Sequence, residues 1–71
     1  MIEIIVNTNS KNSVKKLSEL EKIFKAKKIV YKVHRTSKTI TAKELMDEVS
    51  SEELIVIGGD GTINEVINNY H

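Results

Sequence analysis

The stretch Leu54–Val66, LIVIGGDGTINEV, decides the fold expected for this chain. It opens with a continuous apolar run, Leu54–Ile57, which is typical of a parallel strand covered on both faces. The run stops at Gly58 and Gly59, and an amphipathic pattern follows. All 3 glycines of the 71 residues lie within this one turn, with Asp60 among them. A strand, a glycine-rich turn and a helix in this order predict a place where the backbone approaches an anion.

The turn has the chemistry of a phosphate-binding loop, although two familiar templates do not fit it. Open α/β sheets bind ligands beyond the carboxyl ends of their strands, where free helix N–H groups favour phosphate. Gly58, Gly59 and Gly61 would allow close backbone approach and positive φ. The turn contains no lysine, as a P-loop requires, and Asn64 stands where the dinucleotide fingerprint has its third glycine.

The polar residues of the turn have two interpretations each. A carboxylate facing phosphates is repulsive unless Mg²⁺ or a set of donors intervenes, so Asp60 could mark a Mg-nucleotide site. Asp60 could equally cap the following helix or bond within the turn. Thr62 and Glu65 have the spacing of a capping box, which favours a structural role for both at the start of the helix. The residues of the turn alone do not decide between a ligand-binding and a capping role.

Strand and helix patterns alternate along the whole chain. β-branched and apolar runs predict strands at 2–6, 29–33 and 54–57, and the first run breaks at the turn-forming residues 7–10. Apolar residues at helical spacing predict three helices: from Ser13, with Val14, Leu17, Leu20, Ile23 and Phe24; from a capping box at Thr41–Glu44, with Ala42, Leu45, Met46 and Val49; and after the glycines, with Ile63, Val66, Ile67 and Tyr70.

The order βαβαβα predicts one α/β domain over residues 1–71, a three-layer arrangement around a short parallel sheet. Three strands are few for a doubly wound sheet, and a fourth would be the natural continuation. We therefore expect the chain to be the front part of a domain.

Composition narrows the class of protein. The net charge of +1 gives no electrostatic argument for nucleic acid, and no apolar run is long enough to span a bilayer. The N-terminus lacks a signal-peptide pattern, so we expect a cytoplasmic protein. A domain of this size without cysteine is expected to be marginally stable, which favours association with a second copy or a companion chain.

The segment Gly58–Val66, GGDGTINEV, resembles the signature of the diacylglycerol kinase catalytic-domain family. This family includes bacterial lipid kinases, sphingosine kinases and ceramide kinases, and it is related to the NAD kinases. GGDGT alone would admit either branch, whereas INEV is similar to the lipid-kinase branch. Asn7–Lys11 is similar to the family's Asn-Pro-x-Ser-Gly turn, with Asn and Ser kept, Pro and Gly lost, and Lys11 a possible substitute charge. Thr36 matches a family threonine that contacts the nucleotide.

The resemblance implies ATP-dependent phosphorylation of a lipid hydroxyl, such as that of diacylglycerol, with Mg²⁺ as cofactor. It implies that Asp60 is a metal ligand. The nucleotide-binding residues that it implies are Asn7, Ser10, Lys11, Thr36, Gly58, Gly59, Asp60, Gly61, Thr62, Asn64 and Glu65. The family's general base and lipid-binding surface lie in a later β-rich domain with no counterpart here. The catalytic base is therefore unassigned, and we expect this chain to be inactive alone and to meet lipid only with that domain supplied.

Two alternatives remain at this point. One is a non-catalytic nucleotide- or phosphate-binding module that oligomerises, and the other is an NAD kinase-like fragment. Two further features are interpreted as structural. His34 is expected to be a solvated residue at a strand end, and Lys15, Lys16, Lys22 and Lys25 are expected to form a solvated helix face without a ligand.

Overall fold

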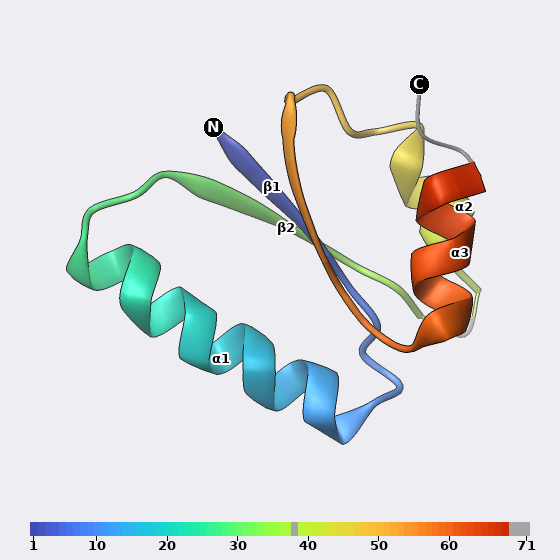
Figure 1. The fold of residues 1–71 in the computed structure, drawn as a ribbon, viewed down its shortest axis with the longest axis horizontal. Coiled ribbons are helices and arrows are strands. Elements are labelled where there is room, and N and C mark those ends of the chain that lie inside the picture. Colours follow the sequence, from blue (N-terminus) through green and yellow to red (C-terminus); the bar gives the residue numbers. More distant parts are fainter. Residues whose placement is uncertain (38, 69–71) are drawn as a thin grey trace.

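The computed structural model describes residues 1–37 and 39–68, with the backbone but not the side chain of Asp60. These residues form three strand–helix pairs (Figure 1). The elements are β1 (Ile2–Val6), α1 (Lys11–Ala26), β2 (Tyr31–Arg35), α2 (Ala42–Met46), β3 (Glu53–Ile57) and α3 (Asp60–Asn68). The predicted α/β class and element order are confirmed, although β2 lies two residues later than predicted. The expected contribution of Tyr70 to the third helix lies outside the described residues.

β1 is the central strand of a parallel sheet with the order β2–β1–β3. Its last residue, Val6, is in register with Arg35 at the end of β2 and with Ile57 at the end of β3. Because the three strands end level, the three loops that follow them open at one edge of the sheet. This carboxyl edge is where ligands bind in open α/β sheets.

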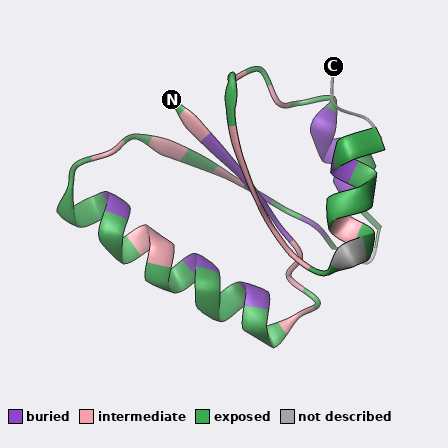
Figure 2. Ribbon diagram, viewed as in Figure 1, coloured by how far each residue is buried: buried purple, intermediate pink, exposed green. Residues whose placement is uncertain are grey.

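Different helices cover the two faces of the sheet (Figure 1). Alternate residues of a strand point to opposite faces, so β1 contributes to two separate cores. Ile4 and Val6 pack with α1, whereas Ile5 packs with α2 and α3. The helix residues in these cores are Leu17 and Phe24 on the α1 side, and Ala42, Leu45, Met46 and Val66 on the other side. Figure 2 shows that β1 is almost entirely buried between the two layers.

The α1 helix begins two residues earlier than predicted, because Ser10 caps it: the Ser10 hydroxyl accepts a hydrogen bond from Ser13 N. The buried stripe is therefore Ser13, Leu17 and Phe24, and the expectation that Val14 and Ile23 belong to it is wrong. Both are about half exposed, at 46% and 50%. At 3.6 residues per turn they lie about 90° to either side of the buried stripe.

The C-terminus of α1 is closed by backbone hydrogen bonds. Ile29 N donates to Phe24 O at 2.8 Å and Lys28 N donates to Lys25 O at 3.2 Å, which is the Schellman pattern. Lys28 occupies the left-handed position with φ 56°, where glycine is usual. The chain turns there so that Ile29 packs on the α1-side core before β2 begins.

A buried polar network was not expected from the sequence. His34 is 5% exposed, so the prediction of a solvated strand end is wrong. Its Nε2 atom donates to Glu3 Oε1 at 2.8 Å, and Glu3 Oε2 accepts from Ser50 N and Ser51 N at 2.9 and 2.6 Å. The reason is the parallel register, which sets β1 and β2 side by side and places His34 on the same face as Glu3.

None of the helices in the described part of the chain is long and apolar enough to cross a bilayer.

Candidate functional site

The loops after β1 and β2 are joined by side-chain hydrogen bonds at the carboxyl edge. Asn7 Oδ1 accepts from Asn9 N at 2.9 Å and from the Thr36 hydroxyl at 3.4 Å. The Thr36 hydroxyl accepts in turn from Thr8 N at 3.3 Å, and the Thr8 hydroxyl donates to Thr36 O. Asn7 and Thr36, which the sequence analysis assigned to nucleotide binding, are therefore neighbours held in place by each other.

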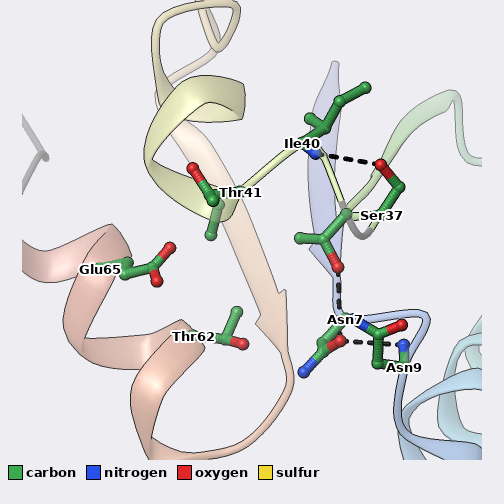
Figure 3. A pocket seen from close by; sticks show the side chains of 9 residues that line it. Asn7, Asn9, Ser37, Ile40, Thr41, Thr62 and Glu65 are labelled. Atoms are coloured by element: carbon green, nitrogen blue, oxygen red, sulfur yellow. Dashed lines mark hydrogen bonds between the residues drawn. The ribbon is translucent and has the colours of Figure 1, made fainter.

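A hollow of about 150 Å³ opens beside this pair, on the side of the sheet covered by α2 and α3 (Figure 3). We call it the α2-side hollow. Thr62 and Glu65 project into it from α3, opposite Asn7 and Thr41 (Figure 3). Its lining consists of Asn7, Asn9, Thr36, Ser37, Ile40, Thr41, Ala42, Thr62 and Glu65. Four of the predicted residues thus meet in one place, although they come from three segments of the chain.

The capping-box interpretation of Thr62 and Glu65 is wrong. The α3 helix begins at Asp60, and Ile63 N already donates to Gly59 O at 3.1 Å, so Thr62 lies inside the first turn. Glu65 instead reaches across to the next helix, where its Oε2 atom accepts from Lys43 N at 3.3 Å. At the other predicted capping box, the Thr41 hydroxyl does accept from Glu44 N at 3.3 Å. Glu65 therefore holds the start of α2 against α3.

None of the glycines in the turn has a positive φ, so the expectation that they are needed for that conformation is wrong. Gly58 is needed for space, since an added Cβ would lie 2.8 Å from the Cβ atom of Thr62. Gly59 and Gly61 are different, because a Cβ on either would meet no atom within 4 Å. The turn is therefore packed tightly on one side and open at Gly59.

A second hollow, of about 450 Å³, lies across the turn, on the face covered by α1. We call it the α1-side hollow. Its floor is the end of β3 and the Gly58–Gly59 backbone, and its far wall is the first two turns of α1. The lining residues are Ser10, Asn12, Ser13, Lys16, Val56, Ile57, Gly58, Gly59 and Ile63. Ser10, Gly58 and Gly59 were predicted to bind nucleotide.

The remaining predicted residues lie elsewhere. Lys11, Gly61 and Asn64 are exposed and line neither hollow. The side chain of Asp60 is outside the described part of the structure. Sequence reasoning missed Asn12 and Lys16, because the polar side of an amphipathic helix has no local mark of what it faces. The one available signal was the position of Asn12 and Lys16 shortly after the Ser10 cap.

The donor set of this edge does not form a ready-made metal cage. Among the described residues, no three or more His, Asp or Glu side chains are grouped so that they could hold a metal ion. Mg²⁺ retains several waters and usually takes only one or two carboxylates together with substrate phosphates. The described residues therefore do not form a complete metal site made by protein alone, and Mg²⁺ that arrives with a nucleotide would not need one.

A parallel α/β sheet with polar loops and a glycine turn at its carboxyl edge defines the class of α/β ligand-binding domains. The family model of the diacylglycerol kinase catalytic domain matches residues 2–70. The chain therefore belongs to the diacylglycerol kinase catalytic domain family, a family of lipid kinases, as the resemblance of Gly58–Val66 predicted. Comparisons with curated proteins and with solved structures gave no significant match.

Proposed function

We propose that this chain binds ATP with Mg²⁺ at the carboxyl edge of its sheet and forms the nucleotide side of a lipid kinase. The observation that carries the proposal is the position of the β3–α3 turn between two polar hollows. Gly58 and Gly59 of this turn line the α1-side hollow, and Thr62 and Glu65 of the helix that it starts line the α2-side hollow. The predicted residues Asn7, Ser10 and Thr36 reach the same edge from other segments.

The chemistry suits phosphoryl transfer, which depends mainly on positioning and on stabilising charge. The open backbone at Gly59 would allow phosphate oxygens to approach its N–H group. Asp60 would hold Mg²⁺ there, as the resemblance implies, and the ion would supply positive charge that offsets the charge of the phosphates. The lipid hydroxyl would be phosphorylated only when the acceptor-binding part of the enzyme is supplied. We also propose a cytoplasmic location, because the reaction needs ATP.

Calorimetric titration of the 71-residue polypeptide with ATP tests the nucleotide site. We expect binding that requires MgCl₂ and that is weakened in Asp60→Ala. Asp47→Ala is the matched control, because Asp47 is the only other aspartate and is exposed at the end of α2. Equal affinities of the wild type and Asp60→Ala would leave Asp60 a structural residue, and no binding by the wild type would overturn the proposal.

A kinase assay tests whether these residues suffice for catalysis. Labelled ATP, Mg²⁺ and diacylglycerol vesicles are incubated with the purified polypeptide. We expect no lipid phosphorylation, because the resemblance places the general base and the acceptor surface outside residues 1–71. Measurable transfer that disappears in Asp60→Ala would show that the base lies within this chain.

A second candidate is a non-catalytic nucleotide-binding module that self-associates. It is favoured by a hollow of about 390 Å³ lined by Glu52, Leu54, Val56, Val66 and Ile67. The hollow lies along β3, which pairs on one side only among the described strands, and Ile67 is 65% exposed. Sedimentation at several concentrations should show a mass that rises with concentration and falls back in Ile67→Lys. A monomer at every concentration would rule this candidate out.

A further inference from the structure

Positive and negative charge are separated along the chain. Residues 1–36 hold nine lysines and arginines against three acidic residues, whereas residues 37–71 hold two against seven. The net charge of +1 therefore combines one half that carries +6 with another that carries −5. The separation is as large without Lys38 and Asp60, whose side chains lie outside the described structure.

Most of the positive charge lies on α1 and the residues that end it. Seven lysines between positions 11 and 28 are all exposed, and Glu19 and Glu21 are the only acidic residues in this segment. Four of the lysines follow one side of the helix, because spacings of 4, 7 and 3 residues keep nearly the same direction at 3.6 residues per turn. This lysine row is about 21 Å long and consists of Lys11, Lys15, Lys22 and Lys25.

The lysine row points away from the rest of the molecule. The side of α1 that packs on the sheet carries Ser13, Leu17 and Phe24, and the row lies on the opposite side of the helix. Both ion pairs found within the described residues involve His34, so no described carboxylate is paired with the row. The expectation that these lysines are solvated is confirmed for a single copy of the chain.

The row also opposes the electrostatic preferences of a free helix. The first turn of α1 contains no acidic residue, although cations are unfavourable beside the positive end of the helix dipole. Lys11 and Lys15 are four positions apart, and like charges at this spacing destabilise a helix. A negatively charged surface laid against the row would reduce both costs, so the row suits an acidic partner.

An exposed surface of the opposite charge lies on the other side of the sheet. Residues 42–53 contain five carboxylates and one cation, Lys43, and all six side chains are exposed. The helix α2 at the start of this segment packs on the face of the sheet that α1 does not cover (Figure 1). We call the four glutamates of this segment the glutamate surface: Glu44, Glu48, Glu52 and Glu53.

We propose that the lysine row of one copy of this chain binds the glutamate surface of a second copy. The two surfaces cannot meet within one chain, because the row faces outward from one side of the sheet and α2 lies on the other. Since the contact joins unlike surfaces, each added copy leaves one of each kind free, and the copies associate head to tail. Complementary charges speed the encounter and fix the orientation of the two copies.

Sedimentation at two salt concentrations tests whether charge drives association. The wild type is measured between about 10 μM and about 1 mM protein, the range of weak affinities. Charges act over about 30 Å in about 10 mM NaCl and over about 3 Å in about 1 M NaCl. We expect a mass that rises with protein concentration clearly more in the low salt. Association of equal strength in both salts would belong to an apolar contact, such as the hollow along β3, and would overturn the proposal.

Charge reversal identifies the two surfaces. Lys15→Glu combined with Lys22→Glu reverses the row, and Glu44→Lys combined with Glu53→Lys reverses the glutamate surface. We expect the dissociation constant of each double variant in low salt to rise by about tenfold or more. An equimolar mixture of the two variants should associate again, because one keeps its glutamate surface and the other keeps its row.

The matched control is Lys27→Glu combined with Lys32→Glu, which makes the same change of net charge at exposed lysines outside the row. Most of the association should remain in this variant. Thermal melting shows whether each variant is folded, and glutamine takes the place of the reversed residues in any variant that is not. A loss in the control as large as that in the row variant, or no recovery in the mixture, argues against the two surfaces and overturns the proposal.

The result is independent of the proposed nucleotide site, because the measurement contains no nucleotide. A wild type that stays monomeric in low salt overturns the head-to-tail contact and leaves ATP binding as it is. If such a monomer sediments with phosphatidylglycerol vesicles, the row takes an anionic lipid surface and not a second copy, and the proposal is again overturned.

Discussion

Glu3 and His34 form a buried pair across β1 and β2, with Glu3 Oε1 accepting from His34 Nε2 at 2.8 Å. The other carboxylate oxygen accepts from Ser50 N and Ser51 N, so one side chain joins two strands to the connection that leads into β3. In the described residues no buried side-chain nitrogen or oxygen lacks a partner. A fully satisfied polar cluster of this kind holds its elements in one arrangement.

Replacing Glu3 should destabilise the fold. We expect Glu3→Gln to lower the free energy of unfolding by on the order of 2 kcal/mol, because an amide cannot accept on both sides as the carboxylate does. Urea denaturation measures the change, with Glu19→Gln on the exposed face of α1 as the control. A loss no larger than that of the control would show that the pair does not stabilise the fold.

The Glu3–His34 pair should also make the free energy of unfolding depend on pH in the acid range. The hydrogen bond from His34 and the N–H groups of Ser51 and Ser50 outweigh burial and lower the pKa of Glu3 from 4.5 to about 2. A carboxyl whose pKa is lower in the folded state stabilises the fold above its unfolded pKa and loses that contribution as the pH falls through the folded value. The difference in unfolding free energy between the wild type and Glu3→Gln should therefore shrink between pH 4.5 and 2. A difference that stays constant through this range would contradict the prediction.

Tyr31 should titrate at unusually high pH. Its hydroxyl donates to Glu21 Oε2 at 2.7 Å and so ties β2 to α1, and this bond is the main cause that raises the pKa of Tyr31 above 10. The contribution to stability is present below pH 10 and is lost as the pH rises through the folded pKa. Absorbance titration in a Tyr70→Phe background, where Tyr31 is the only tyrosine, should give a lower midpoint with Glu21→Gln. An unchanged midpoint would mean that the hydrogen bond is absent in solution.

Glycine at position 28 should stabilise the protein. Lys28 has φ 56°, a conformation that costs a residue with a Cβ about 1 kcal/mol or more. We expect Lys28→Gly to raise the unfolding free energy by about 1 kcal/mol. Lys27→Gly is the control, because φ there is −93° and glycine brings no relief. Equal effects of the two substitutions would argue against the Schellman geometry at the end of α1.

The glycines of the turn should respond in opposite ways to alanine. Gly58→Ala places a methyl group 2.8 Å from Thr62 Cβ, and we expect a loss of about 1–3 kcal/mol from overpacking. Gly61→Ala meets no atom and lies in the first turn of α3, so helix propensity should add up to about 1 kcal/mol. Denaturant unfolding of both variants checks the sign, and a loss with Gly61→Ala would indicate that the turn changes shape in solution.

Local sequence patterns predicted most of the architecture. The alternation of β-branched runs with helical spacing predicted the order of the elements, because backbone preference and side-chain period act over a few residues. Leu54–Val66 predicted the strand, the turn and the helix, together with the family. The predicted start of β2 was wrong because Ile29 belongs to the Schellman turn at the end of α1. The sequence has no glycine at this turn to mark it.

The sequence was thus sufficient for the class of fold, the family and the location of the glycine turn at a strand end. Only the tertiary structure showed that His34 is buried, that Glu65 holds α2, and that Lys16 lines a hollow beside the turn. Each of these facts depends on contacts between residues far apart in the chain, 31 positions for Glu3 and His34 and 22 for Lys43 and Glu65. Such contacts follow from strand order and helix placement, and a local pattern of polar residues is the same whether it faces water, a carboxylate or a ligand.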